Sequence, residues 1–278
     1  GALIVTRMSR HALSESAPSC VRRKQRVLCL HSFRTSGAIL KQQLFLFSNL
    51  GTVLSEYCDL DYIDAPHRCS PADDNKLDPL ITQVFEGPYH EWFNADRRLA
   101  HEGGAVEYHY LEESLRAVAD AVKRRGPYDG LIGFSQGGTL AHLCAMLAHA
   151  GRLPFEPPQF IIAICSRASR HYAHQELRER ARLRMPALVV YNGEDDKVSP
   201  EETLRLIATF AYPVGQVHLQ HERGHAIKRL PAVEVERTRR FLAELPEPRA
   251  HPGRGTGARL LARLSACVPL CWATSVPF

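Results

Sequence analysis

Ser135 lies at the centre of Gly133-Phe134-Ser135-Gln136-Gly137, a Gly-x-Ser-x-Gly stretch that could carry nucleophilic chemistry. A serine hydroxyl attacks a carbonyl well only when a base takes its proton and its side chain projects from the backbone. Glycines two residues before and after the serine permit the sharp strand-to-helix turn that gives this projection. Apolar residues precede the stretch and a helical pattern follows it. The sequence therefore predicts that Ser135 is a catalytic nucleophile.

A serine nucleophile on such a turn needs an acid and then a histidine later in the chain, each just after a strand. The predicted strand 187–192 is followed by two carboxylates, of which we take Asp196 as the acid and Asp195 as the alternative. Apolar residues alternate over 217–221, as in a strand, and His225 follows as the predicted base. The acid would orient the imidazole and stabilise the imidazolium during proton transfer.

The negative charge that develops on the attacked carbonyl needs two backbone N–H groups aimed at it. We expect one from Gln136, the residue after the nucleophile. The other should come from the loop after the first strand, "LHSFRTSG", at Phe33. His31 in this loop is interpreted as a strand-end histidine whose partners are backbone groups, without a catalytic role.

Two other readings use the same residues. His221 to His225 also fit H-E-x-x-H, in which two histidines one helical turn apart bind zinc. That motif requires a helix, whereas Gly224 and the alternating pattern before it favour a strand and a turn. The second reading is a non-catalytic member of the fold that binds a partner. We favour the serine mechanism, with no metal and no cofactor.

Short apolar runs alternate with helical patterns along the chain, which is typical of a mainly parallel sheet covered by helices. The predicted strands are 26–31, 53–65, 129–134, 159–165, 187–192 and 217–220, and the predicted helices are 39–47, 111–122, the segment after Ser135, and 233–245. Residues 64–104 break this rhythm with four prolines and several aromatic residues. We expect this segment to form an insertion, or lid, over the carboxyl edge of the sheet, where open α/β folds bind ligands.

The 278 residues suffice for one α/β domain, predicted at 26–248. The net charge of +5 resides at the two ends, since 1–25 and 249–278 together carry nine basic residues and one acidic residue. We expect the basic leader 1–25 and the tail 249–278 to be poorly ordered. The slightly acidic body argues against nucleic-acid binding, and no apolar run is long enough to span a membrane.

Eight cysteines at irregular spacing, without a CxxC pair, indicate reduced thiols in an intracellular protein. We therefore expect a cytoplasmic location. The leader 1–25 is rich in Arg and Ser with a single acid, a composition that organellar transit peptides also have.

Several segments together resemble the FSH-type family of serine hydrolases: "RVLCLHSFR", "DAPH", "EWF", "LEESLRAVADAVKRRGPYDGLIGFSQGG", "FIIAIC", "GEDDKVSP" and "GH". The resemblance covers 26–245 and implies a compact α/β-hydrolase fold without a cofactor. It implies hydrolysis of carboxylic esters, and some fungal members release acyl chains from a carrier as thioesterases. By position, its nucleophile, acid and base fall on Ser135, Asp196 and His225. The family's aromatic stretch falls on Trp92 and Phe93, which suggests that they contact the acyl chain.

The chain departs from the family pattern at three places. Ser32 follows His31 where the family has glycine, Arg223 replaces the first glycine before His225, and Cys165-Ser166-Arg167 replaces Ser-Gly-Phe. The last change would put the Arg167 cation beside the pocket. We predict a serine hydrolase that cleaves esters or thioesters of apolar acyl chains, its substrate being a small-molecule ester or a carrier-bound thioester.

Overall fold

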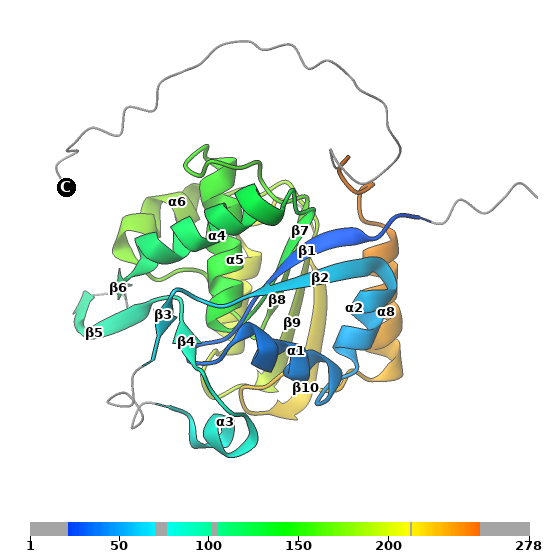
Figure 1. The fold of residues 1–278 in the computed structure, drawn as a ribbon, viewed down its shortest axis with the longest axis horizontal. Helices are drawn as coiled ribbons and strands as arrows, with labels where there is room; N and C mark the ends of the chain where they lie inside the picture. Colours follow the sequence, from blue (N-terminus) through cyan, green and yellow to red (C-terminus); the bar gives the residue numbers. More distant parts are fainter. Residues whose placement is uncertain (1–21, 70–76, 102–104, 212, 251–278) are drawn as a thin grey trace, which may run out of the picture.

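A six-stranded sheet, in which every strand pair is parallel, forms the centre of the molecule (Figure 1). The computed structural model describes residues 22–69, 77–101, 105–211 and 213–250. The strand order is β10-β9-β8-β7-β1-β2, with β1 at Gln25–Leu30, β2 at Cys58–Ile63, β7 at Gly130–Phe134, β8 at Phe160–Ile164, β9 at Ala187–Glu194 and β10 at Gly215–Arg223. The predicted parallel sheet is confirmed, and its strands all end at one edge.

Helices cover both faces of this sheet (Figure 1). One face is covered by α1 (Gly37–Phe45), α2 (Leu50–Tyr57) and α8 (Ala232–Ala243). The other is covered by α4 (Leu111–Arg125), α5 (Gln136–His149), α6 (Gln175–Arg180) and α7 (Pro200–Ile207). A strand buried on both faces must be apolar throughout rather than alternating, which explains the continuous apolar runs in β8 and β9.

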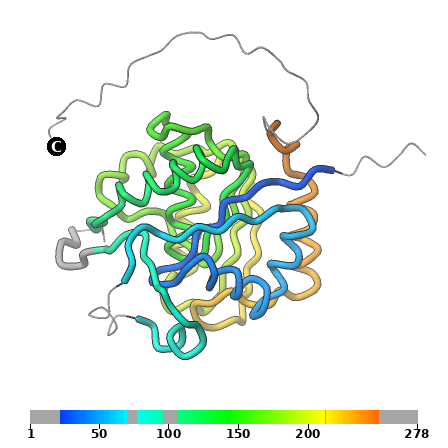
Figure 2. The backbone as a smooth tube through the Cα atoms, in the orientation of Figure 1, coloured from blue at the N-terminus to red at the C-terminus, as the bar shows by residue number. Residues whose placement is uncertain are grey.

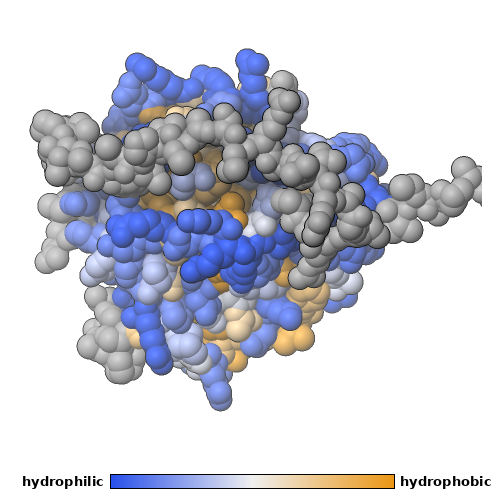
Figure 3. Space-filling view, turned by 45° about the horizontal axis from the view of Figure 1, so that its top comes forward, coloured by the Kyte–Doolittle hydropathy of each residue, from blue (hydrophilic) through white to orange (hydrophobic). Residues whose placement is uncertain are grey.

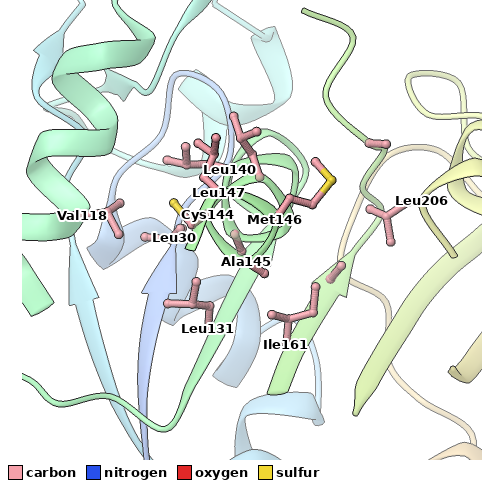
Figure 4. Close-up of a cluster of buried hydrophobic side chains, with 14 of the residues drawn as sticks. Leu30, Val118, Leu131, Leu140, Cys144, Ala145, Met146, Leu147, Ile161 and Leu206 are labelled. Carbon is pink, nitrogen blue, oxygen red and sulfur yellow. The ribbon is translucent and has the colours of Figure 1, made fainter. Parts of the chain in front are cut away.

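Two hydrophobic cores result, one on each side of the sheet. Along β1, Val27 and Cys29 point into the core beneath α1 and α2, whereas Leu28 and Leu30 point into the core beneath α5. Figure 4 shows part of the second core, where Leu140, Cys144 and Leu147 of α5 pack over the sheet. The helix that leaves Ser135 is thus fixed by burial on several sides.

The second strand differs from its predicted bounds. It begins at Cys58 rather than at residue 53, because the preceding residues form α2. Leu50, Val53 and Leu54 in that helix are buried, at the spacing of one helical face. The helix runs directly into β2 without a turn residue between them, so the sequence offered no boundary signal at Cys58.

The predicted insertion has secondary structure of its own. It contains β3 (His67–Arg68), α3 (Pro79–Val84), β4 (His90–Glu91) and β5 (Asn94–His101). β3 pairs with β4, and β5 pairs in antiparallel fashion with β6 (Ala105–His109), so the β5–β6 pairing continues past the predicted end at 104. Residues 70–76 and 102–104 lie outside the described residues, as do the leader up to residue 21 and the tail from residue 251.

The first and last described segments lie side by side (Figure 2). Arg22 donates hydrogen bonds to the Leu245 and Pro246 carbonyls, and the buried Asp129 carboxylate accepts from the backbone N–H groups of Arg26 and Arg249, each at 2.7 Å.

On the face seen in Figure 3, hydrophilic side chains surround smaller hydrophobic areas. Within the described ranges no helix is long and apolar enough to cross a bilayer.

Candidate active site

Ser135 occupies a strained turn between β7 and α5, as the Gly-x-Ser-x-Gly stretch predicts. Its backbone has φ 53° and ψ −114°, a conformation that non-glycine residues rarely adopt. A Cβ on Gly133 would lie 2.3 Å from the Gly137 carbonyl carbon, and one on Gly137 would lie 2.1 Å from the Leu30 carbonyl oxygen. Both positions therefore require glycine for the turn to close. The strained backbone is at Ser135 itself, and it makes the hydroxyl project from the turn.

His225 lies beside the Ser135 hydroxyl. Its Nε2 is 2.6 Å from Ser135 Oγ, and its Nδ1 is 2.8 Å and 3.0 Å from the two carboxylate oxygens of Asp195. Because a carboxylate can only accept, Nδ1–H donates to Asp195 and Nε2 accepts from the hydroxyl. The Phe134 ring stacks on the imidazole at a centroid distance of 5.2 Å. The three side chains form a serine–base–acid arrangement.

The structure places Asp195, the alternative acid, beside His225, whereas Asp196, the first choice, does not contact it. Asp196 is 59% exposed and pairs with Lys197 at 3.3 Å, whereas the Asp195 carboxylate is 1% exposed against His225. β9 continues to Glu194, two residues beyond its predicted end, so the first residue after the strand is Asp195. Asp195 Oδ1 also accepts from the N–H groups of Lys197 and Val198 at 2.8 and 2.9 Å, which closes an Asx-type turn.

The environment of Asp195 favours its ionised form. Burial on its own raises the pKa of this carboxyl, but the hydrogen bond from His225, the charge of His225 and the two backbone N–H donors outweigh it and bring the pKa below its ordinary value. A carboxylate that stays ionised can hold the imidazole in one tautomer and stabilise the imidazolium.

Asn192 supports His225 from beneath, a role that the sequence analysis missed. Its side chain is 1% exposed, and Nδ2 donates to the carbonyls of Gly224 and Ala226 at 2.9 and 3.0 Å. These carbonyls flank His225, so one amide fixes the backbone on both sides of the histidine. A polar residue at the end of the apolar run "ALVVYN" was the available signal, since a buried amide must find partners.

Phe33 and Gln136, the predicted oxyanion residues, line the same cleft as Ser135. Gln136 begins α5, where backbone N–H groups lack intrahelical partners. Its side chain has a second task, because Oε1 accepts from Trp92 N at 2.9 Å and Nε2 donates to the Phe93 carbonyl at 2.6 Å. Gln136 thus ties the insertion to the nucleophile turn.

His31 is bound by backbone groups, in accordance with the sequence interpretation. Nδ1–H donates to the Ser32 carbonyl at 2.7 Å, and Nε2 accepts from Ala65 N at 2.9 Å. Burial lowers the pKa of His31 to about 4, so the ring is neutral at pH 7. The imidazole therefore braces the loop that carries Phe33 against the start of the insertion.

The three candidate substrate-binding residues have different positions. Trp92 is fully buried, and its indole N–H donates to the His31 carbonyl at 2.9 Å. Trp92 is absent from the cleft lining, so the expected contact of its side chain with an acyl chain is not supported. Its hydrogen bond holds the neighbouring Phe93 segment, which forms one wall of the cleft. Phe93 lines the cleft and stacks on Tyr108 at 4.2 Å, and Arg167 also lines the cleft.

The zinc motif does not have the geometry that it requires. His221 and Glu222 lie on β10, and Gly224 follows in the left-handed region at φ 75°. The two histidines are therefore not on one face of a helix, and both ring nitrogens of His225 face Ser135 and Asp195.

The cleft beside Ser135 has a volume of about 270 Å³. Phe33, Phe93 and Tyr108 supply aromatic surface, and Arg167, Arg170 and Lys197 supply cationic groups. Ligand pockets commonly have volumes of roughly 300–1,000 Å³, so this cleft suits a small group. The arrangement would allow Ser135 to attack a carbonyl group bound in a cleft that has both aromatic and cationic lining residues.

Known proteins resemble this chain in both sequence and fold. The family model described as "Serine hydrolase (FSH1)" matches residues 21–232. A human protein named Esterase OVCA2 is 35% identical over 225 residues, which cover 77% of this chain and 93% of that protein.

Two solved structures share the fold at low sequence identity. The crystal structure of esterase PE8 has a TM-score of 0.52 at 22% identity and covers 81% of this chain and 94% of that one. Acyl-protein thioesterase 2 of Zea mays has a TM-score of 0.52 at 19% identity with the same coverage. The predicted α/β-hydrolase fold is thereby confirmed.

Proposed function

Since this chain belongs to the FSH1 family of serine hydrolases, we propose that it cleaves carboxylic esters or thioesters through an acyl-enzyme formed on Ser135. The chain is a serine hydrolase by family, and the assignment of the three reacting residues is the proposal. The observation that carries it is the continuous contact from Ser135 Oγ through His225 to Asp195, with distances of 2.6 and 2.8 Å.

In the first half-reaction Ser135 Oγ attacks the substrate carbonyl and His225 Nε2 takes the hydroxyl proton. Asp195 stabilises the imidazolium that forms and does not itself take the proton. The tetrahedral intermediate collapses, His225 gives its proton to the departing alcohol or thiol, and an ester bond to Ser135 remains. The second half-reaction repeats these steps with water as the nucleophile, which releases the acid and restores Ser135.

The oxyanion of the intermediate would be bound by the backbone N–H groups of Phe33 and Gln136. The two residues lie on the loop after β1 and at the start of α5, and both line the cleft with Ser135. Loss of one such donor in another hydrolase costs about 2.7–4 kcal/mol of transition-state stabilisation. The buried Ser32 and the contacts of His31 support a rigid loop at Phe33.

The lining of the cleft supports a substrate with an apolar acyl portion of modest size. Phe93 of the insertion and Tyr108 of β6 stack on each other and line the cleft. Because Trp92 is buried and Trp92 and Phe93 are hydrogen-bonded to His31 and Gln136, this aromatic surface is held in place rather than being free to open around a long chain.

Intact-mass analysis after treatment with a fluorophosphonate tests the nucleophile. We expect one adduct on the native protein, because a serine that is hydrogen-bonded to a base is activated, and none on Ser135→Ala. Turnover of a short 4-nitrophenyl ester should fall about 10⁶-fold in Ser135→Ala, as in a hydrolase where this change has been measured.

Ser199→Ala serves as the matched control, because Ser199 caps α7 and lies outside the proposed triad. Its labelling should equal that of the native protein. Activity of Ser135→Ala within about tenfold of the native value, or an adduct on that variant, would refute the proposed mechanism.

A further inference from the structure

The cleft beside Ser135 has an unbalanced charge. Arg167, Arg170 and Lys197 line it, and its lining residues include no carboxylate. A cationic concave site concentrates anions and strengthens their binding. Whether the cations are already neutralised depends on the carboxylates that touch them from outside the lining.

Glu202 is shared between the two arginines. Its Oε1 lies 2.5 Å from Arg167 Nη1 and 3.9 Å from Arg170 Nη1. Arg167 also donates to the Lys197 carbonyl, so its guanidinium is held between Glu202 and the loop that follows β9. One carboxylate therefore compensates Arg167 closely and Arg170 only weakly.

The remaining carboxylates nearby leave the imbalance in place. Lys197 pairs with Asp196 at 3.3 Å, but both side chains are 59% exposed, and exposed pairs of this kind interact weakly. Asp195 is engaged by His225 and by two backbone N–H groups.

Arg170 retains hydrogen-bonding capacity toward a ligand. Its side chain lines the cleft and is 38% exposed, and its Nη1 lies 3.9 Å from Glu202 Oε1, beyond hydrogen-bond distance. The backbone is fixed, because Arg170 N donates to the Tyr108 hydroxyl at 2.8 Å. A guanidinium that is anchored at its backbone can offer a planar pair of donors to a carboxylate or phosphate.

We propose that the substrate carries an anionic group, a carboxylate or a phosphate, which Arg170 and Lys197 bind in the cleft while Ser135 attacks the carbonyl of the same molecule. Phe93 and Tyr108 contact the apolar segment between the two. This inference rests on the proposed function, and it narrows the substrate from any small ester to an anionic one. The anion belongs either to the acyl part or to the leaving group.

Matched pairs of substrates distinguish these two sources. The 4-nitrophenyl monoester of adipic acid is compared with 4-nitrophenyl 6-methylheptanoate, in which an isopropyl group replaces the carboxylate. S-Butanoyl phosphopantetheine is compared with S-butanoyl pantetheine, so that the charge lies on the leaving group. We expect kcat/KM to favour the anionic member of at least one pair roughly ten- to hundredfold, the size of a hydrogen bond to a charged group.

The Arg170→Gln variant should abolish most of that preference, measured as the ratio of kcat/KM for the anionic member to kcat/KM for the neutral member of each pair. Arg180→Gln is the matched control, since Arg180 is 79% exposed and pairs with Glu176 on α6. It removes the same charge from the protein and should leave the preference intact. Equal kcat/KM values within both pairs in the native protein would overturn the inference and leave the hydrolase proposal standing.

Binding can be measured even if turnover fails. Titration calorimetry of Ser135→Ala should show saturable binding of at least one of two probes, monomethyl adipate and phosphopantetheine, and that binding should weaken at least tenfold when Arg170→Gln is added. Absence of saturable binding of monomethyl adipate and of phosphopantetheine to folded Ser135→Ala would overturn the inference. Failure of fluorophosphonate labelling would instead count against the proposed function alone.

Discussion

The proposed triad and the wall of the cleft meet at one site but are held in different ways. Ser135 and Asp195 follow directly on β7 and β9, and His225 follows β10 after one intervening residue. The cleft wall at Trp92 and Phe93 belongs to the insertion, and side-chain hydrogen bonds join it to Gln136 at the start of α5 and to His31 after β1. The proposed reacting groups are therefore positioned by the ends of the strands, whereas the proposed substrate-contacting surface is positioned by a few polar contacts.

A buried ion pair adds to the attachment of the wall. Arg34 Nε lies 2.8 Å from Glu91 Oε2, with exposures of 2% and 9%. Breaking such a pair by removing one partner leaves an uncompensated buried charge. Substitutions in the two regions should consequently differ in kind: those at the strand ends should lower kcat, and those at the attachments should alter KM and stability.

The largest difference is expected between two neighbouring carboxylates. Asp195→Asn should lower kcat about 10⁴-fold, the loss seen when the acid of such a triad is replaced in another enzyme, because the imidazole loses its preferred tautomer. Asp196→Asn should change kcat by no more than about twofold, since its side chain faces solvent. Steady-state kinetics with a neutral 4-nitrophenyl ester measures both. A larger loss in Asp196→Asn would restore the original choice of acid.

Asn192→Leu should lower kcat roughly ten- to hundredfold, because the carbonyls that flank His225 lose the amide that fixes them, at a cost of about 1–3 kcal/mol. Tyr191→Phe is the control on the same strand, since it removes a hydrogen bond to Gln216 that lies apart from His225. The rate of fluorophosphonate labelling should fall with kcat in Asn192→Leu while KM stays nearly constant. A change in KM alone would show that Asn192 does not position the base.

Gln136→Met tests the attachment of the wall, because the backbone N–H proposed to bind the oxyanion is retained. Loss of both side-chain hydrogen bonds should raise KM about tenfold, in line with an unpaired buried amide costing about 1–3 kcal/mol. The labelling rate with a small fluorophosphonate should change less than threefold. Gln136→Glu, which keeps the acceptor for Trp92 N, should give an intermediate KM. Equal losses of labelling and of ester affinity would erase the distinction between the two regions.

The smallest expected effect is on the pH dependence of folding stability, through the buried His31 ring that joins the Phe33 loop to the insertion. In the unfolded chain a histidine has a pKa of about 6.5, whereas burial lowers the pKa of His31 to about 4. As the pH falls the unfolded state binds the proton first, so stability is lost between these values, about 2 kcal/mol from pH 7 to pH 5.

Urea unfolding at the two pH values should show a loss smaller by this amount in His31→Gln. His142→Gln removes another histidine whose pKa burial lowers, to about 3, and which bonds Thr209. It should reduce the pH dependence similarly but leave kcat/KM unchanged, whereas His31→Gln should lower it. An unaltered pH dependence in His31→Gln would show that this ring is not held neutral.

The sequence by itself predicted the parallel sheet, and it singled out Ser135 and His225, the proposed nucleophile and base. The runs that became β7, β8 and β9 are apolar throughout because both faces are buried, and Gly133 and Gly137 mark a turn in which a Cβ does not fit. His225 could be chosen because it follows an alternating strand. These signals are local, so one sequence carries them without any knowledge of distant contacts.

Only the tertiary structure decided between Asp195 and Asp196, because the choice depends on where β9 ends, and β9 extends to Glu194 through pairing with β10. It also showed that Trp92 is buried rather than exposed to the cleft. The hydrogen bonds of Asn192 beside His225 and of Gln136 to the insertion were likewise visible only in the structure. Each of these outcomes depends on a partner at least 30 residues away in the chain. Hydrophobic periodicity predicts which face of a helix or strand is buried. It does not predict which distant polar group will form a hydrogen bond with a side chain on that element.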